Sequence, residues 1–296
     1  MAGFTSLLHR FERNISVLGR AQRTFDCYSR HVAALALHFK CLPTELDAEQ
    51  VQDYLYLLQQ RSKTPSQTYF KHTVYGLRFL LKTEGLPYDF LKLPSIPKVD
   101  KLPVILSRQE IWRMLQTAKL LKHKLLIGLL YGCGMRCMEV RNLELKHLDF
   151  DRKVVHIVQS KGNKDRYVPL SEHLIRGLKT YIQIEHPKRF LFEGTSSKDP
   201  RGFDGRYSQR GVQWAVGEVA KQAGILKEVH PHMLRHSYGT HLLEDGNSIL
   251  ICQKLMGHAS IESTMVYLHV CQLEEQLPKS PLDRVFAQCR SDKNKA

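Results

Sequence analysis

The sequence predicts a mainly α-helical protein of two domains, with one small antiparallel β-sheet in the second domain. Three observations lead to this fold class. Apolar residues recur at helical spacing through residues 4–84, where no convincing strand is found. A proline-rich stretch at residues 93–103 interrupts that pattern. Two short strand-like segments then flank a Gly-Asn turn within residues 154–170.

The first domain, residues 1–92, is predicted to consist of four helices. Its first two helices are expected at residues 4–17, which are amphipathic, and at residues 21–39, where aromatic and aliphatic residues alternate at helical spacing. Asp47 can cap a third helix, and Ser66 can cap a fourth that Gly85 ends. Basic residues here are candidate DNA contacts, although a solvated basic face explains them equally well: Arg20, Arg23, Lys63, Lys71 and Arg78.

The second domain is expected at residues 104–296. Residues 92–103 hold three prolines and four charged residues, a composition that favours an extended linker. We place the linker itself at residues 93–103, directly after the first domain. After the linker, Ser107 and Glu110 form a capping box that opens a helix.

A glycine break in the second domain precedes an arginine of interest. The helix at residues 121–131 is apolar nearly all round, so we expect it to be buried core. Gly132 and Gly134 end it, and Arg136 opens the next helix with Glu139 one turn later. Arg136 can therefore project into a cleft while Glu139 holds its guanidinium, although the same spacing also fits an ordinary helix ion pair.

The predicted sheet is a hairpin. Residues 154–158 are β-branched and strand-like, residues 160–165 form the turn, and residues 166–170 return as the second strand. Lys161 and Lys164 lie at the tip, where lysines are normally just solvated. Beyond the hairpin we expect a helix capped by Ser171, a DNA-contacting loop at residues 193–210, which is rich in Gly, Ser, Lys and Arg, and a helix at residues 211–223.

A further helix is expected to begin at Pro231, a residue suited to a first helical turn. His232 and Arg235 are three residues apart, so they lie side by side on one face of this helix. Gly239 falls between them on the helical wheel and is expected to leave room for a ligand. The group His230, His232, His236 and His241 suggests zinc, but no matching Cys or carboxylate set accompanies it, so no metal is predicted.

The next helix is expected to start at Asn247 or Ser248 and to end at Gly257. His258 then follows a helix end, where a side chain can be aimed. Ser260 is expected to cap a short helix carrying Tyr267 in an exposed position. A tyrosine among this many cations is a candidate nucleophile, although its ordinary pKa of about 10 means that it needs help to lose its proton.

The composition points to a polyanionic partner. The chain has 44 Lys and Arg against 29 Asp and Glu, a formal net charge of +15, and both halves are basic. The 7 Cys form no Cys-x-x-Cys pair and are expected to be reduced thiols. No apolar run is long enough to cross a membrane, and the first 20 residues do not resemble a signal peptide, so a cytoplasmic protein is expected.

The ordered series His-x-x-Arg, Gly-His and Tyr at 232–267, together with the Gly-Cys-Gly-Met-Arg run that ends at Arg136, resembles the tyrosine recombinase (phage integrase) family. This resemblance implies a helical, SAM-like core-binding domain before an α+β catalytic domain. It implies that Tyr267 attacks a DNA phosphate and becomes joined to the 3′ end, without metal, cofactor or ATP. Double-stranded DNA is the implied partner, with several protomers, expected to be a tetramer, assembled on it.

The same resemblance assigns roles residue by residue. Arg136 and Arg235 would grip the non-bridging phosphate oxygens, and Glu139 would support Arg136. Lys161, with Lys164 as the fallback, would protonate the leaving 5′ oxygen. The other implied roles are proton transfer from Tyr267 for His232 and a phosphate hydrogen bond for His258. Lys164 and Arg166 are further candidate DNA contacts. The tail at residues 281–290 would dock on a neighbouring protomer.

Three functions compete at this point. The first is a site-specific recombinase acting in integration, chromosome resolution or transposition. The second is a type IB topoisomerase-like enzyme, which would relax supercoiled DNA without a specific site. The third is a non-catalytic DNA-binding regulator, for which replacing Tyr267 would change nothing. The complete catalytic set argues against the regulator, because a binding protein has no use for it.

Overall fold

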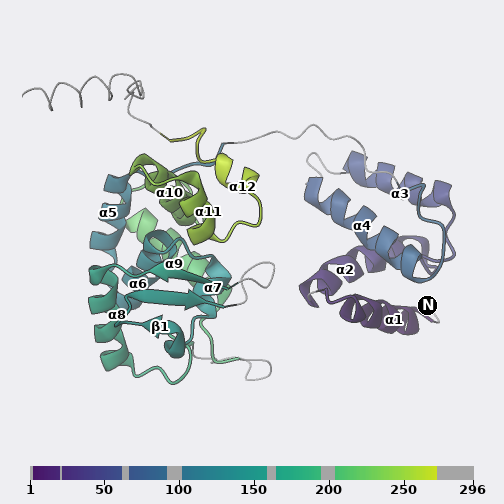
Figure 1. Cartoon of the computed structure of the whole chain (residues 1–296). Coiled ribbons are helices and arrows are strands. Elements are labelled where there is room, and N and C mark those ends of the chain that lie inside the picture. Colours follow the sequence, from purple (N-terminus) through teal and green to yellow (C-terminus); the bar gives the residue numbers. More distant parts are fainter. Residues whose placement is uncertain are drawn as a thin grey trace, which may run out of the picture. The chain divides into compact units, whose positions relative to one another are not determined.

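The computed structural model of the chain describes residues 3–20, 22–61, 67–91, 102–158, 165–194 and 204–271. It divides into two compact units, residues 1–99 and 100–296 (Figure 1). The division falls inside the predicted linker, most of which lies outside the described residues. Among the helices that are described, none is both long and apolar enough to cross a bilayer.

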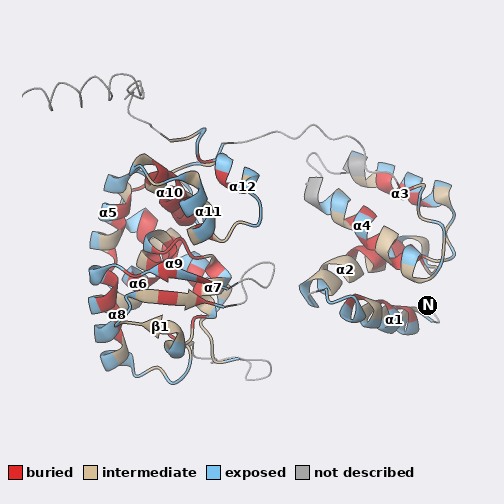
Figure 2. Cartoon of the chain, in the orientation of Figure 1, coloured by how far each residue is buried: buried red, intermediate tan, exposed pale blue. Residues whose placement is uncertain are grey.

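The first unit is helical, as predicted. Its four helices are α1 (Phe4–Val17), α2 (Gln22–Phe39), α3 (Ala48–Arg61) and α4 (Gln67–Thr83). Their apolar faces meet in one core, seen as the inward-facing buried residues in Figure 2, which includes Phe11, Leu35 and Leu77. Asp47 caps α3 by accepting from the Gln50 amide at 2.8 Å. The predicted cap Ser66 lies outside the described residues.

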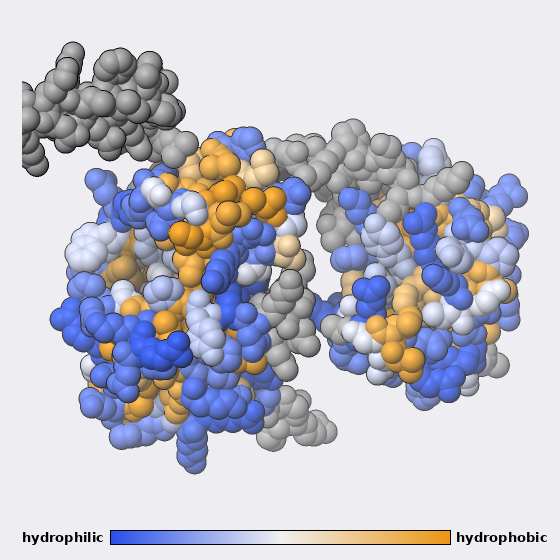
Figure 3. Space-filling view, viewed as in Figure 1, coloured by the Kyte–Doolittle hydropathy of each residue, from blue (hydrophilic) through white to orange (hydrophobic). Residues whose placement is uncertain are grey.

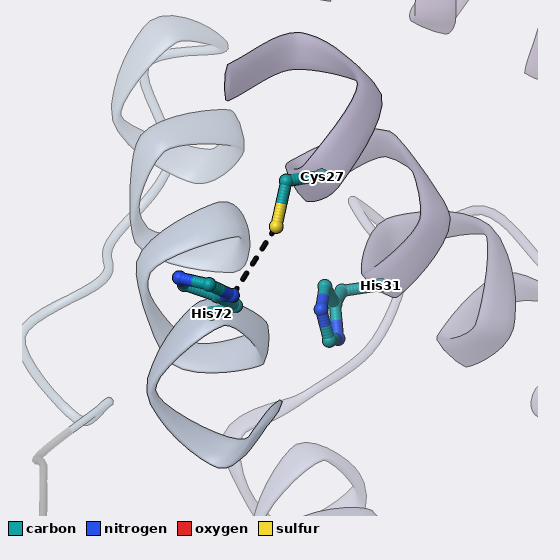
Figure 4. Close-up of side chains that lie close together, drawn as sticks. All are labelled: Cys27, His31 and His72. Carbon is teal, nitrogen blue, oxygen red and sulfur yellow. Dashed lines mark hydrogen bonds between the residues drawn. The ribbon is translucent and has the colours of Figure 1, made fainter. Parts of the chain in front are cut away.

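Polar side chains join α2 to α4 inside this unit (Figure 4). Cys27, His31 and His72 bring three possible metal-ligand atoms within 4.8 Å of one another, the one such group in the described part of the chain. Cys27 Sγ lies 3.2 Å from His72 Nδ1, and His31 Nδ1 lies 2.8 Å from the Thr73 hydroxyl. Because these hydrogen bonds already engage the atoms concerned, we interpret the group as a polar contact between two helices.

The second unit is built around one buried helix. Its helices are α5 (Arg108–Thr117), α6 (Leu121–Gly132), α7 (Cys137–Arg141), η1 (Leu145–His147), α8 (Glu172–Glu185), α9 (Gln209–Gln222), α10 (Pro231–Glu244), α11 (Ile249–Met256) and α12 (Glu262–Met265). The apolar helix α6 packs against α5, α8, α9 and α10, which confirms its predicted place in the core. The predicted capping box at Ser107 is present, with both hydrogen bonds formed.

The sheet has three antiparallel strands in the order β1-β2-β3: Leu148–Asp149, Val154–Ile157 and Arg166–Pro169. The hairpin of β2 and β3 is confirmed, with Val155 opposite Val168. The sequence analysis missed β1, which pairs Leu148 with Val155. A strand of two residues has too little periodicity to be recognised without its partner.

Two predicted helix starts differ in the structure. Helix α9 begins at Gln209, two residues before the expected Gly211, because the Ser208 side chain accepts from the Gly211 amide and caps it. Ser260 does not cap α12; its hydroxyl bonds the Glu262 carboxylate instead, and Ile261 stands at the N-cap. Helix α12 ends at Met265, so Tyr267 lies in the turn that follows rather than on a helix.

The end of the unit that carries α11 and α12 has an apolar surface (Figure 3). Its exposed apolar side chains are Leu250, Ile251, Met265, Val266 and Leu268, each at least 40% exposed. Polar residues surround this area, and the buried core lies beneath it. The segment that carries Tyr267 is therefore amphipathic, with apolar neighbours outside and the tyrosine inside.

Candidate active site

Arg136 is fixed at the start of α7. It is the N-cap residue, and its backbone N–H donates to Glu139 Oε2 at 2.8 Å. One guanidinium nitrogen donates to Glu139 Oε1 at 2.7 Å and another to the Gly257 carbonyl at 3.2 Å. Because the side chain is only partly buried, the guanidinium keeps an exposed part that can bind an anion.

Arg235 lies deeper, on the buried face of α10. It is 3% exposed and donates to the carbonyl oxygens of Gly134 and Met256. Burial and the neighbouring charge of Arg136 lower the pKa of Arg235 to about 10, so it stays charged at neutral pH. Two guanidiniums are therefore held close together, an arrangement that favours a phosphate between them.

Two glycines shape the frame around Arg235. Gly134 has a φ of 57°, and a Cβ there would lie 2.2 Å from the Tyr238 ring, so no larger residue fits. Gly257 ends α11 with a φ of 62°, the left-handed stop that was predicted. These two turns present carbonyl groups to the guanidiniums, which anchors both arginines to the backbone.

Tyr267 is buried, which corrects the expectation of an exposed side chain. It is 2% exposed and packs in a cluster with Tyr238, Leu243, Cys252 and Met256. Burial raises the pKa of Tyr267, while the charges of Arg235 and then Arg136 act in the opposite direction. The hydroxyl is therefore protonated at neutral pH and lies in the field of both guanidiniums.

Gly239 does not leave room for a ligand, as had been expected. A Cβ there would lie 2.8 Å from Met256 Sδ and 2.9 Å from Cε2 of Tyr267. The space over this glycine is filled by the tyrosine ring itself. Gly239 thus lets the candidate nucleophile pack directly on α10.

His258 follows the end of α11 and is half-buried. Its Nδ1 lies 2.9 Å from the Thr264 hydroxyl, and its ring stacks on Tyr267 with 6.1 Å between centroids. Burial, followed by the charges of Arg235 and Arg136, lowers its pKa to about 4. His258 is therefore a neutral imidazole beside the two arginines at physiological pH.

His236 is a site residue that was not predicted from the sequence. Its Nδ1 lies 3.0 Å from the Tyr267 hydroxyl. His232, which was assigned to proton transfer, is exposed, and its ring centroid lies 6.4 Å from that of His236. The signal was present, because His236 directly follows Arg235 and is one turn from His232, but these histidines had been considered together only as metal ligands.

Arg166, a candidate DNA contact, is buried against Glu139 in this structure. It is 7% exposed, and its two amino groups donate to the two oxygens of Glu139 at 2.9 and 2.7 Å. Its Nε donates to the Leu255 carbonyl at 2.8 Å. Arg166 thus ties β3 to α7 and α11 in this structure.

Glu139 thus holds two arginines at once. Burial disfavours its charged form, but the hydrogen bonds and charges of Arg166 and Arg136 outweigh burial and lower its pKa to about 2. A carboxyl whose pKa is lowered by folding stabilises the fold above its unfolded pKa of about 4.5. That contribution is lost as the pH falls from there towards 2.

Replacing Glu139 with Gln should remove this pH-dependent contribution. The fold should lose about 3 kcal/mol at pH 7, because the buried arginines would lose their counter-charge. Urea unfolding from pH 7 to pH 3 would show wild type and E139Q converging towards acid. E172Q is the matched control, because the Glu172–Lys153 pair is exposed and should contribute little. A constant gap between wild type and E139Q across this range would contradict the linkage.

The remaining predicted residues are distributed as follows. Lys161, Lys164 and Lys63, as well as the tail at residues 281–290, lie outside the described residues. Arg20, Arg23 and Lys71 are exposed on the first unit, and Arg78 is half-buried there. A cavity of about 540 Å³ opens beside Arg136 and Glu139, between α7 and the sheet. The site as described therefore unites Arg136, Glu139, Arg235, His236, His258 and Tyr267.

Comparison with known proteins places the chain among sequence relatives. Residues 105–274 match the model of the phage integrase family. A putative integrase/recombinase (y4qK) of Sinorhizobium fredii is 33% identical over 94% of this chain and 89% of the relative. The tyrosine recombinase XerA of Pyrococcus horikoshii is 30% identical over 94% of each chain.

Solved structures show the same fold. A crystal structure of XerA recombinase aligns over 97% of this chain and 98% of that one, with 25% identity and a TM-score of 0.51. The integrase of the transposon Tn1549, in complex with circular intermediate DNA, aligns over 88% of this chain and 94% of that one. Its identity is 20% and its TM-score 0.66.

Proposed function

This chain belongs to the phage integrase family, whose members include tyrosine recombinases, and we propose that Tyr267 is the nucleophile with which it breaks and rejoins DNA. The observation that carries the proposal is the placement of one buried phenol in the field of two anchored guanidiniums. A phosphodiester makes use of both features together, because it binds the guanidiniums and accepts the attack.

The proposed reaction is a pair of transesterifications. Arg136 and Arg235 bind the non-bridging oxygens of a scissile phosphate, and the Tyr267 oxygen forms a bond to phosphorus. The bond to the 5′ oxygen breaks, leaving a 3′-phosphotyrosyl link and a 5′ hydroxyl. Lys161 is proposed to protonate that oxygen, and His258 to donate a hydrogen bond to the phosphate. The two guanidiniums stabilise the charge that develops on the phosphate oxygens.

The covalent link retains the energy of the broken bond, so the strand can be rejoined without a nucleotide cofactor. When the 5′ hydroxyl that attacks belongs to another duplex, the outcome is strand exchange. Exchange between two duplexes requires several protomers, and we propose a tetramer on DNA. The exposed Arg20, Arg23 and Lys71 are proposed to bind the duplex from the first unit, in the cytoplasm.

Covalent trapping tests the assignment of Tyr267. Wild-type protein is incubated with sheared DNA of its source, denatured and digested with trypsin, and the peptides are searched for a nucleotide adduct. An adduct on the peptide that contains Tyr267 is expected, and sequencing of the attached DNA would identify the target. DNA binding without an adduct under any condition would contradict the proposal and favour a regulator.

The number of target sequences distinguishes a site-specific recombinase from the remaining alternative, a topoisomerase-like enzyme. A site-specific recombinase should yield adducts at one sequence or a small set. A topoisomerase-like enzyme should yield adducts at many sites and relax a supercoiled plasmid that lacks the target. The relatives reported above are named recombinases and integrases, which favours the first outcome.

A further inference from the structure

One histidine of α10 contacts the reacting atom of the site. Nδ1 of His236 lies 3.0 Å from the Tyr267 hydroxyl, across 31 positions of the chain. The two rings are tilted, with centroids 5.7 Å apart. His236 is half-buried and directly follows Arg235 on α10.

The direction of this hydrogen bond follows from the charges around it. His236 faces His232, Arg235 and His230 from its own helix and its N-cap, and it faces Tyr267 and His258 from the segment after α11. Burial, followed by the charges of His232, Arg235 and His230, lowers the pKa of His236 to about 4. The ring is therefore neutral at pH 7. A protonated phenol then donates to the lone pair of Nδ1, and the ring proton lies on Nε2.

The other two histidines are less well placed to accept this proton. His258 uses Nδ1 on the Thr264 hydroxyl and stacks nearly parallel to the Tyr267 ring, with 19° between the planes. His232 is exposed, and the hydrogen bonds found for the described residues join Tyr267 to His236 instead.

We propose that His236 is a catalytic residue that takes the phenolic proton of Tyr267 during cleavage and returns it during rejoining. The inference rests on Tyr267 being the nucleophile. As the Tyr267 oxygen bonds to phosphorus, its proton moves to Nδ1 of His236, which becomes an imidazolium. The leaving 5′ oxygen takes a separate proton, from the general acid. The negative charge of the bound phosphodiester partly offsets the two arginines, which favours the protonated form of His236.

The variant His236→Gln separates proton transfer from positioning. A glutamine oxygen can accept the hydrogen bond of Tyr267 but cannot take its proton. We expect single-turnover adduct formation to fall by about 10²–10⁴-fold. The residual rate should rise with pH up to pH 9, because hydroxide would replace the missing base. His236→Asn serves as the second variant if the glutamine variant is unstable by thermal unfolding.

The chain offers a matched control in a second His–Tyr pair on α10. His241 Nδ1 lies 2.9 Å from the Tyr131 hydroxyl, and neither residue belongs to the site described above. H241Q loses a histidine from the same helix and the same kind of contact, so it should retain the wild-type rate and pH profile when compared as a folded protein. A decrease in H241Q equal to that of H236Q would mean that both act through the fold, and would overturn the proposal.

A DNA substrate in which sulfur replaces the bridging 5′ oxygen of the scissile phosphate distinguishes the two proton transfers. One removes the proton of Tyr267, and the other gives a proton to the leaving 5′ oxygen. A thiolate leaves without a general acid, so this substrate should restore cleavage to Lys161→Ala but not to His236→Gln. Rescue of His236→Gln would place His236 on the leaving group and overturn the proposal, as would a rate within threefold of wild type. Wild-type protein reports separately on the underlying function, because a lack of adduct there rejects Tyr267 and not only His236.

Discussion

Replacing Tyr267 with phenylalanine is expected to abolish strand cleavage while leaving DNA binding intact. The ring packs on Gly239 and Met256, and phenylalanine keeps these contacts. The change removes the hydroxyl and its hydrogen bond to His236, worth about 1 kcal/mol of stability. Without its nucleophile the site should lose more than about 10⁴-fold in cleavage rate, as is typical when a covalent catalyst is removed.

Three measurements check this expectation. A mobility shift on native gels reports DNA binding, a denaturing gel reports cleavage and covalent complex, and thermal unfolding reports the fold. Phe70→Leu, which alters the core of the first unit, would serve as a control substitution of an aromatic residue. Cleavage by the Tyr267 variant at a tenth of the wild-type rate or more would place the nucleophile elsewhere.

Replacing Arg235 with lysine is expected to reduce cleavage by about 10²–10³-fold. Arginine donates to the carbonyls of Gly134 and Met256 and still has donors for a phosphate. A lysine has one ammonium group and cannot reproduce this planar arrangement. One buried carbonyl would lose its partner, so the fold should also lose about 1–3 kcal/mol.

Arg136→Lys provides the comparison. Arg136 is partly exposed, so its loss should lower cleavage with a smaller loss of stability. Single-turnover cleavage is measured at saturating protein, well below the unfolding temperature of every variant, so that chemistry is separated from folding. If Arg235→Lys cleaves within threefold of wild type under these conditions, Arg235 does not bind the reacting phosphate.

Local signals in the sequence were enough for most of the fold. Asp47, Ser107, Ser171 and Ser248 each cap the helix that they were expected to cap, because a cap depends on residues within one turn. The apolar helix α6 and the hairpin of β2 and β3 were predicted because their apolar patterns and turn residues are also local signals. Strand β1 was not, since it depends on a partner strand. The start of α9 was missed although its cap, Ser208, is as local a signal as the other caps.

The site was predicted in its residue types but only partly in its geometry. The order of Arg136, Arg235, His258 and Tyr267 could be recognised along the chain. The burial of Tyr267 depends on Gly239 approaching it from another helix, a contact that no local pattern reveals. Arg166 was taken for a surface charge because Glu139, its partner, is 27 positions away. The contact of His236 with Tyr267, 31 positions away, could not be read from the sequence either, although the place of His236 beside Arg235 was visible.

The carboxylate shared by Arg136 and Arg166 has a consequence for building chimeras. Glu139 is on α7, whereas Arg166 begins the strand after the hairpin turn. A hairpin transplanted from a relative would bring its own residue at position 166. Without a basic residue there, Glu139 would lose the partner that contributes most to lowering its pKa. Arg136 would then no longer be held in its present orientation. The hairpin and α7 are therefore one exchangeable module, and grafts that move them together should retain activity more often than grafts that move either alone.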